Sequence, residues 1–169
     1  MEPSPTIYDP IAVANFFVQK SLETGTEVTP MKLLKLVYIA HGWHLGLYGK
    51  PLIDEAVEAW TYGPVVPDVY RKFKEYGRGR ITKLASEMKI SGLSVQFVTP
   101  TVPDTDQQTR SLLEEIWKVY GDKDGLYLSA ITHQEGTPWS LTEKNGIIAQ
   151  DKIEAHYRTL ANTANPTTA

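Results

Sequence analysis

The chain has 169 residues, of which 41% are hydrophobic and 22% are charged, and it carries a formal net charge of −3 at pH 7. This length and composition predict one folded domain that buries about two-thirds of its unfolded surface, and they exclude disorder over most of the chain. Because there is no cysteine, disulfide scaffolds, cysteine-based zinc sites and thiol nucleophiles are excluded as well.

We expect neither a membrane-spanning segment nor a secretion signal in this sequence. Its first residues, "MEPSPTIYDP", lack the charged and then apolar plan of a signal peptide, and no stretch reaches about 18 uninterrupted apolar residues. We therefore expect no membrane partner and a cytoplasmic location, which the lack of cysteine also suits.

Charge is distributed unevenly along the chain. From Arg71 to Lys89 there are seven Lys or Arg residues against Glu75 and Glu87, a local balance of +5, so the other 150 residues carry −8. The net negative charge of those 150 residues would repel phosphate groups, which argues against nucleic-acid binding by the whole chain.

Two helices near the N-terminus begin with the same signal, a capping residue followed by proline at the first helical position. The signal occurs at Asp9-Pro10 and again at Thr29-Pro30. Gly25 and Gly49 predict where these two helices end.

The second of these helices, residues 31–48, is apolar around nearly its whole circumference. Such a helix is normally buried in the middle of its domain, so we expect it to be the central helix of the fold. Lys32 and Lys35 share one edge of it with Gly42 and Gly46. The two glycines would let a neighbouring backbone approach closely.

After the second helix the periodicity changes from helical to alternating. Residues 55–62, "EAVEAWTY", alternate in the manner of a short strand, which Gly63-Pro64 interrupts. A helix is predicted over residues 67–76, followed over residues 78–92 by a loop, either alone or with a short helix in it. Residues 93–99, "LSVQFVT", are predicted to form a second strand that pairs with the first.

Three further helices are predicted in the C-terminal half. Asp104 with Gln107 resembles a capping box and predicts a helix that ends at Gly121. Residues 124–133 form a short helix after an aspartate cap, and residues 148–160 form the last one.

Together these elements predict a mainly α fold of the α+β class. We expect a single compact helical domain over residues 9–160, built around the central apolar helix with a small two-stranded β element. Residues 1–8 are interpreted as an N-terminal extension, and the polar residues 161–169 as a disordered tail.

The clearest candidate for a metal site is the pair His41 and His44, which lie three residues apart on one helix face. A catalytic zinc would need a third ligand, for which the sequence offers His133, His156 or Glu55. The alternative, which we favour, is two histidines that form hydrogen bonds inside the fold. No motif pairs a serine with a base, so we predict no enzyme, no metal and no cofactor.

Aromatic and basic residues between positions 58 and 80, together with Trp139, are the candidates for an interface. Trp60, Tyr62, Tyr70, Tyr76 and Trp139 lie near proline or glycine turns, and they either cap the core or form a partner-binding patch. The segment "YRKFKEYGRGR" could bind nucleic acid or an acidic protein, or it could be the solvated face of an amphipathic helix.

Two blocks of this sequence resemble the Panacea domain family, which is associated with phages and mobile elements. The first is "TPMKLLKLVYIAHGWHLGLYGKPLIDEAVEAWTYGPVVPDVYRKFKEYG", with its K-L-x-K-L-x-Y helix and its E-A-W-x-Y-G-P-V-x-P-x-x-Y segment. The second is "LSAITHQEGTPW", which matches a T-H…P-W pattern. The resemblance extends over nearly the whole chain, from about residue 9 to residue 160.

The resemblance implies an antitoxin of a type II toxin–antitoxin pair that binds a cognate protein toxin directly. Some members of the family deliver a bound toxin to a protease as adaptors, and a homo-oligomer is compatible with either role. The residues that we expect to contact the partner are Trp60, Tyr62, Val66, Asp68, Tyr70, Arg71, Lys72, Lys74, His133 and Trp139.

Two alternative functions stay open at this point. One is a phage or mobile-element adaptor or inhibitor that binds a host protein instead of a toxin. The other is a metal-dependent hydrolase that uses His41, His44 and Glu55.

Overall fold

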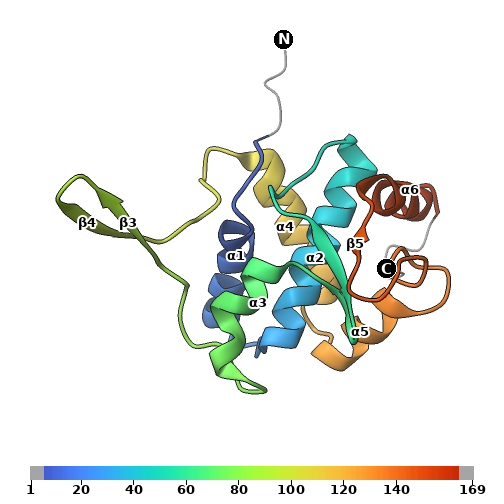
Figure 1. The fold of residues 1–169 in the computed structure, drawn as a ribbon, viewed down its shortest axis with the longest axis horizontal. Helices are drawn as coiled ribbons and strands as arrows, with labels where there is room; N and C mark the ends of the chain where they lie inside the picture. The colour runs from blue at the N-terminus through green and yellow to red at the C-terminus, as the bar shows by residue number, and fades with distance from the viewer. Residues whose placement is uncertain (1–5, 164–169) are drawn as a thin grey trace, which may run out of the picture.

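Helix α2 (Pro30–Tyr48) runs through the middle of the molecule, and the other long helices pack around it (Figure 1). The computed structural model describes residues 6–163. Within them, the remaining helices are α1 (Pro10–Thr24), α3 (Pro67–Phe73), α4 (Gln107–Tyr120), α5 (Gly125–His133) and α6 (Gln150–Ala161), and the 3₁₀ turn η1 (Lys74–Tyr76) continues α3. The prediction of a mainly α fold of the α+β class around a central apolar helix is confirmed.

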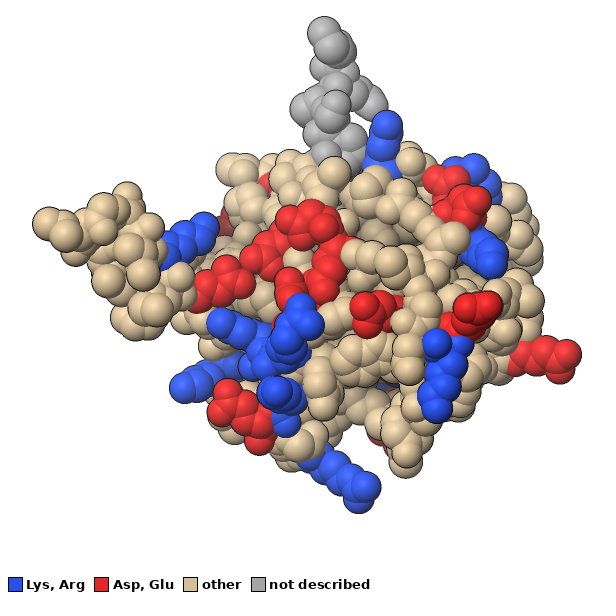
Figure 2. Space-filling model, viewed as in Figure 1, with Lys and Arg blue, Asp and Glu red and all other residues tan. Residues whose placement is uncertain are grey.

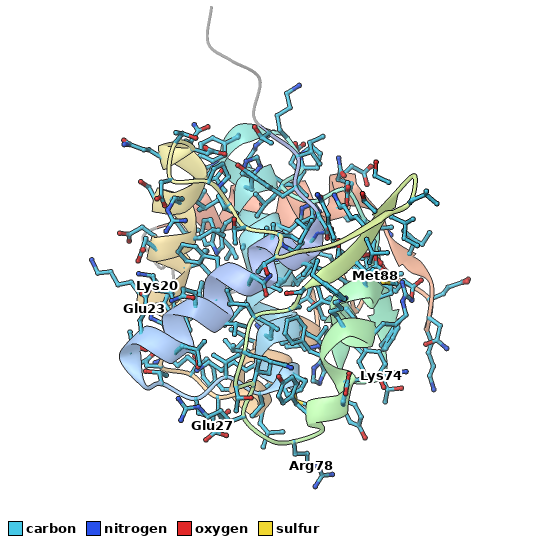
Figure 3. The ribbon with its side chains drawn as sticks, turned by 90° about the vertical axis from the view of Figure 1, so that its left-hand side faces the viewer. Lys20, Glu23, Glu27, Lys74, Arg78 and Met88 are labelled. Atoms are coloured by element: carbon cyan, nitrogen blue, oxygen red, sulfur yellow. The ribbon has the colours of Figure 1, made fainter. Side chains whose placement is uncertain are left out.

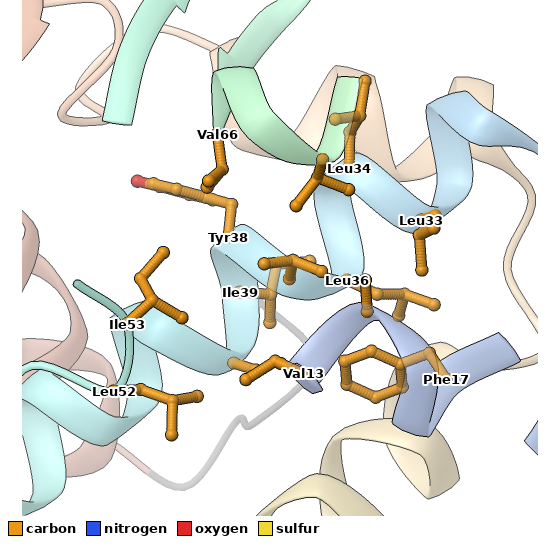
Figure 4. Close-up of a cluster of buried hydrophobic side chains, with 14 of the residues drawn as sticks. Val13, Phe17, Leu33, Leu34, Leu36, Tyr38, Ile39, Leu52, Ile53 and Val66 are labelled. Atoms are coloured by element: carbon orange, nitrogen blue, oxygen red, sulfur yellow. The ribbon is translucent and has the colours of Figure 1, made fainter. Parts of the chain in front are cut away.

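The hydrophobic core forms where α1 and α2 meet the segments that follow them. Phe17 of α1 and Leu36 and Ile39 of α2 are completely buried, and Figure 4 shows them in one cluster with Leu52 and Val66. Because α2 is apolar on nearly every face, it can contribute to this cluster while packing against α4, α5 and α6 on its other sides.

Helices α2 and α6 approach each other closely at the two glycines expected to allow it. A Cβ atom placed on Gly42 would lie 2.2 Å from Cε2 of Tyr157, and one on Gly46 would lie 2.7 Å from the main-chain carbon of that tyrosine. Only glycine fits at these two positions, so the packing prediction for both of them is confirmed.

Most helix ends follow the local signals in the sequence. Asp9 caps α1 by accepting a hydrogen bond from the amide of Ile11 (2.9 Å), and Gly25 and Gly49 end α1 and α2 in the left-handed conformation. The cap of α4 differs from the prediction, because Asp106 and not Asp104 occupies the N-cap.

Tertiary contacts explain the position of that cap. The carboxylate of Asp106 accepts one hydrogen bond from the amide of Thr109 (3.1 Å) and another from the Tyr8 hydroxyl (2.5 Å). Asp104 lies outside the helix, with its carboxylate 3.6 Å from the guanidinium of Arg110. Tyr8, which we assigned to the N-terminal extension, is buried and forms a bridge with Ile53.

Within residues 6–163 the strands form two separate antiparallel sheets, and the predicted pairing of residues 93–99 with 55–62 is wrong. Strand β1 (Val57–Trp60) lies between β2 (Gly63–Val65) and β5 (Ile147–Ile148). Strands β3 (Glu87–Ser91) and β4 (Ser94–Val98) form a hairpin of their own.

Two element boundaries change as a result. Gly63-Pro64 does not interrupt the β structure but starts β2, because the two-residue turn at Thr61-Tyr62 folds the chain straight back onto β1. The last helix begins at Gln150 and not at residue 148, because Ile147 and Ile148 pair with β1.

Residues 1–5 of the predicted extension and residues 164–169 of the predicted tail lie outside the described residues. Between residues 6 and 163, no helix has both the length and the apolar character that crossing a membrane requires.

Candidate functional site

The turn between β1 and β2 brings three of the predicted interface aromatics together. Trp60, Tyr62 and Tyr70 line one cleft of about 460 Å³, which we call the aromatic cleft. The rings of Trp60 and Tyr70 meet edge to face with centroids 5.0 Å apart, and Tyr62 is 67% exposed at the tip of the turn. Large aromatic side chains that remain exposed around a cleft are suited to anchor a protein partner.

Lys35 of α2 also lines the aromatic cleft, and its amine is buried beneath it. Its Nζ atom donates a hydrogen bond to the main-chain oxygen of Pro64 at 3.1 Å. Burial lowers the pKa of Lys35 from 10.5 to about 7. Gly63 has a φ of 118°, and a Cβ atom there would lie 3.0 Å from Nζ of Lys35. The buried lysine therefore packs tightly against the first residue of β2.

A second hollow lies on the other side of α3, and we call it the basic hollow. It has a volume of about 610 Å³, and the cations Arg71, Lys72 and Lys83 line it together with Glu75 and with Phe97 of the β3–β4 hairpin. Lys74, on the following turn, is exposed. In Figure 2 the lysine and arginine atoms gather over this part of the molecule.

At the N-terminal end of α3 the partly buried carboxylate of Glu55 meets two exposed charged residues, Asp68 and Arg71. Oε1 of Glu55 accepts a hydrogen bond from the amide of Asp68 (3.0 Å), and Asp68 in turn forms an ion pair with Arg71. Burial, together with the neighbouring Asp68 carboxylate, raises the pKa of Glu55 to about 7. Glu55 therefore caps α3 from a distant part of the chain.

His133 and Trp139 lie behind the aromatic cleft. Their rings meet with centroids 5.2 Å apart, and Nε1 of Trp139 donates to the main-chain oxygen of Trp60 at 2.7 Å. Ser129, next to His133, donates to the main-chain oxygen of Tyr62 at 2.5 Å. The two predicted contact residues therefore support the turn that carries the aromatics.

Val66, another predicted contact residue, lies in the hydrophobic core and presents no surface to a partner (Figure 4). Ser129 and Lys35 contribute to the site but were not among the predicted residues. The signal for Lys35 was present in the sequence, because a lysine in the middle of a helix that is apolar nearly all round must find a buried acceptor.

His41 and His44 are buried, and each uses Nδ1 for a hydrogen bond with the backbone. His41 accepts from the amide of Leu52 at 3.3 Å, and His44 donates to the main-chain oxygen of Lys50 at 2.5 Å. Burial and the neighbouring His44 lower the pKa of His41 to about 4. Among residues 6–163, no three His, Asp or Glu side chains are grouped so that they could hold one metal ion.

Comparison with known proteins identifies the family. Residues 33–140 match the family described as Antitoxin SocA-like, Panacea domain. The chain is also similar to Antitoxin SocA from Caulobacter vibrioides (strain NA1000 / CB15N), with 34% identity over 138 residues that cover 81% of this chain and 71% of the relative. No solved structure matches. The chain belongs to the Antitoxin SocA-like, Panacea domain family, and the resemblance predicted from its two sequence blocks is confirmed.

Proposed function

We propose that this chain is the antitoxin of a type II toxin–antitoxin pair, and that it neutralises a cytoplasmic protein toxin by binding it directly. Its similarity to Antitoxin SocA, over most of both chains, supports an antitoxin role. The structural observation that carries the proposal is the aromatic cleft, in which the exposed rings of Tyr62 and Tyr70 and the half-buried ring of Trp60 surround an open hollow. Clustered tyrosine and tryptophan side chains contribute most of the binding energy in many protein interfaces.

Helix α3 places two kinds of surface side by side. Tyr70 lines the aromatic cleft, and Arg71 and Lys72, one and two residues later, line the basic hollow. An aromatic anchor next to positive charge suits a partner that inserts apolar side chains and carries acidic ones around them. Binding of this kind neutralises a toxin by covering its active surface and requires no turnover.

The test is to express each gene that flanks this one in a bacterial strain without the locus, alone and together with this chain. We expect one flanking product to stop growth by itself, to be harmless with this chain, and to copurify with it in a fixed ratio. If no flanking product is toxic, or if this chain fails to restore growth, the antitoxin function is wrong.

Substitutions in the cleft then test direct binding. Tyr62→Ala removes an exposed ring from the turn, and we expect it to raise the dissociation constant for the toxin about tenfold or more. Tyr127→Ala removes another exposed tyrosine, on α5 and outside the cleft lining, and is the matched control. Equal affinity of wild type and Tyr62→Ala would show that the toxin binds elsewhere.

A further inference from the structure

The β3–β4 hairpin has one apolar face and one polar face. Met88 pairs with Phe97 and Ile90 pairs with Val95, and side chains of paired residues and of alternate residues lie on the same face of an antiparallel ladder. One face therefore consists of these four apolar side chains. The other face carries Glu87 with Val98, Lys89 with Gln96, and Ser91 with Ser94.

The apolar face of the hairpin is not covered by the rest of the domain. Met88 is 59% exposed, Ile90 69%, Val95 55% and Phe97 76%. Figure 1 shows the hairpin standing away from the helices, and Figure 3, viewed from the side that carries it, shows Met88 on the same side of the molecule as Lys74 and Arg78. Two strands alone are marginally stable in water, and a contiguous exposed apolar patch of this kind marks a contact site.

The base of the hairpin is nevertheless held firmly to α1 by one buried side chain. Nδ2 of Asn15 donates to the main-chain oxygens of Ala85 (2.9 Å) and Pro100 (2.8 Å), and its Oδ1 accepts from the amide of Ala85 (2.8 Å). Ser86 and Thr99 share a further hydrogen bond of 2.9 Å across the two legs. A fully used buried amide is costly to replace, so the fold presents the hairpin in a defined place.

The charge beside the hairpin indicates the chemistry of what binds there. Phe97, on the apolar face, lines the basic hollow together with the cations Arg71, Lys72 and Lys83, which outnumber the one carboxylate in its lining, Glu75. A protein that covers the apolar face therefore also meets these cations, and acidic side chains on it would be attracted. Two copies of this chain joined through the same face would bring their basic hollows to one interface, which disfavours self-association.

We propose that the apolar face of the β3–β4 hairpin, with the basic hollow, is a docking surface for a protein segment that carries aromatic or aliphatic side chains flanked by Asp or Glu. That this segment belongs to the toxin rests on the proposed function. Because α3 lies between the basic hollow and the aromatic cleft, the docking surface extends the site described above and enlarges the area that a toxin can cover.

A phage-displayed library of random peptides, selected on the immobilised full chain, tests the surface without knowledge of the toxin. We expect selected peptides to combine apolar residues with Asp or Glu, and to bind more weakly as salt is raised. The double variant Met88→Thr with Phe97→Thr should weaken their binding about tenfold or more. The matched control, Ser94→Thr with Gln96→Thr on the polar face of the same hairpin, should change it less than about twofold.

Several outcomes would overturn the proposal. In the first, the selected peptides do not differ in composition from the starting library. In the second, they bind the Met88→Thr, Phe97→Thr variant as tightly as wild type. In the third, the selected peptides lack acidic residues. Light scattering that shows a wild-type dimer and a monomer for the apolar-face variant would identify a second copy as the occupant, and would also overturn it.

The growth assay separates this inference from the proposed function. If wild type and the Met88→Thr, Phe97→Thr variant protect cells equally and bind the toxin equally, the antitoxin function stands and the hairpin is not its docking surface. If wild type protects against no flanking product, the antitoxin function fails, and the peptide selection still decides whether the hairpin binds acidic and apolar segments.

Discussion

Nε1 of Trp139 donates a hydrogen bond of 2.7 Å to the main-chain oxygen of Trp60, 79 residues earlier in the chain. The bond joins the two sequence blocks that resemble the Panacea domain. It holds β1 at the point where the chain turns toward Tyr62, and Ser129 holds the main-chain oxygen of that tyrosine in the same way. The second block therefore acts as a support for the aromatic cleft that the first block forms.

We expect Trp139→Phe to lower the free energy of unfolding by about 1–2 kcal/mol, because the oxygen of Trp60 loses its donor and the ring loses contact area. Urea denaturation measures this change, and hydrogen exchange should become faster for the amides of residues 57–65. Tyr62→Phe, at an exposed ring, is the control and should change stability by less than about 0.5 kcal/mol. Equal stability of the two variants would contradict the supporting role of Trp139.

The two glycines of α2 should respond differently to the removal of the Tyr157 ring, which only Gly42 faces. Gly42→Ala and Gly46→Ala should each cost about 1–3 kcal/mol, because both put a methyl group into the α2–α6 contact. At Gly42 the obstacle is the ring of Tyr157, whereas at Gly46 it is the backbone of that residue and of Arg158.

A double-mutant cycle with Tyr157→Leu separates the two cases. In the Tyr157→Leu background the cost of Gly42→Ala should fall, and the cost of Gly46→Ala should stay the same. Both costs are measured by chemical denaturation. A cost of Gly42→Ala that does not depend on Tyr157 would show that α2 and α6 shift apart to accommodate the methyl group.

The buried amine of Lys35 should make the protein more stable as the pH rises from about 7 toward 10. Burial lowers the pKa of this lysine from 10.5 to about 7 in the folded state, so between these values the unfolded chain binds more protons. The free energy of unfolding then increases with pH, by at most about 1.4 kcal/mol per pH unit for one group.

Lys35→Met should flatten this rise when urea unfolding is followed between pH 7 and 9.5. Some slope should remain, because burial also lowers the pKa of Lys32. An unchanged slope in Lys35→Met would mean that Lys35 stays protonated throughout this range.

Glu55 should have the opposite effect at lower pH. Its pKa is raised from 4.5 to about 7 in the folded state, mainly by burial, so the folded chain holds the proton more tightly. The free energy of unfolding therefore falls as the pH rises from about 4.5 to about 7. Glu55→Gln keeps an acceptor for the amide of Asp68 and removes the charge, so this variant should be more stable than wild type above pH 7.

Thermal denaturation at pH 5 and at pH 8 checks the Glu55→Gln prediction. Glu23→Gln removes the same charge from an exposed site and controls for the change in net charge. If Glu55→Gln is no more stable than Glu23→Gln at pH 8, the carboxylate of Glu55 is not destabilised by its surroundings.

Helix starts and the central helix were predictable because their signals are local. An aspartate or threonine before proline caps a helix with its own side chain, as at Asp9 and Thr29. An apolar circumference leaves α2 no position except the middle of the domain. The α4 cap was less predictable because Asp104 and Asp106 are both suitable locally, and the hydrogen bond from Tyr8 favours the second.

The strand pairings were not predictable in the same way. Residues 93–99 have the alternation of a strand, but alternation does not say which strand is the partner. The pairing of β4 with β3 follows from the short turn at Gly92, whereas the pairing of β1 with β5 joins segments about 90 residues apart. The list of expected contact residues shows the same limit, because nothing local to Val66 indicates that its side chain is buried in the core.

Periodicity, capping residues and the two family blocks thus establish from sequence alone a mainly helical member of the Antitoxin SocA-like, Panacea domain family. Only the tertiary structure decides that Trp60, Tyr62 and Tyr70 share a cleft above a buried Lys35, and that the apolar face of the β3–β4 hairpin stays exposed. The physical reason is that a residue type and its spacing set local conformation, whereas burial depends on which distant segments meet it. The apolar side chains of α2 and of the hairpin are alike in kind, and only the chain path places one group in the core and the other in water.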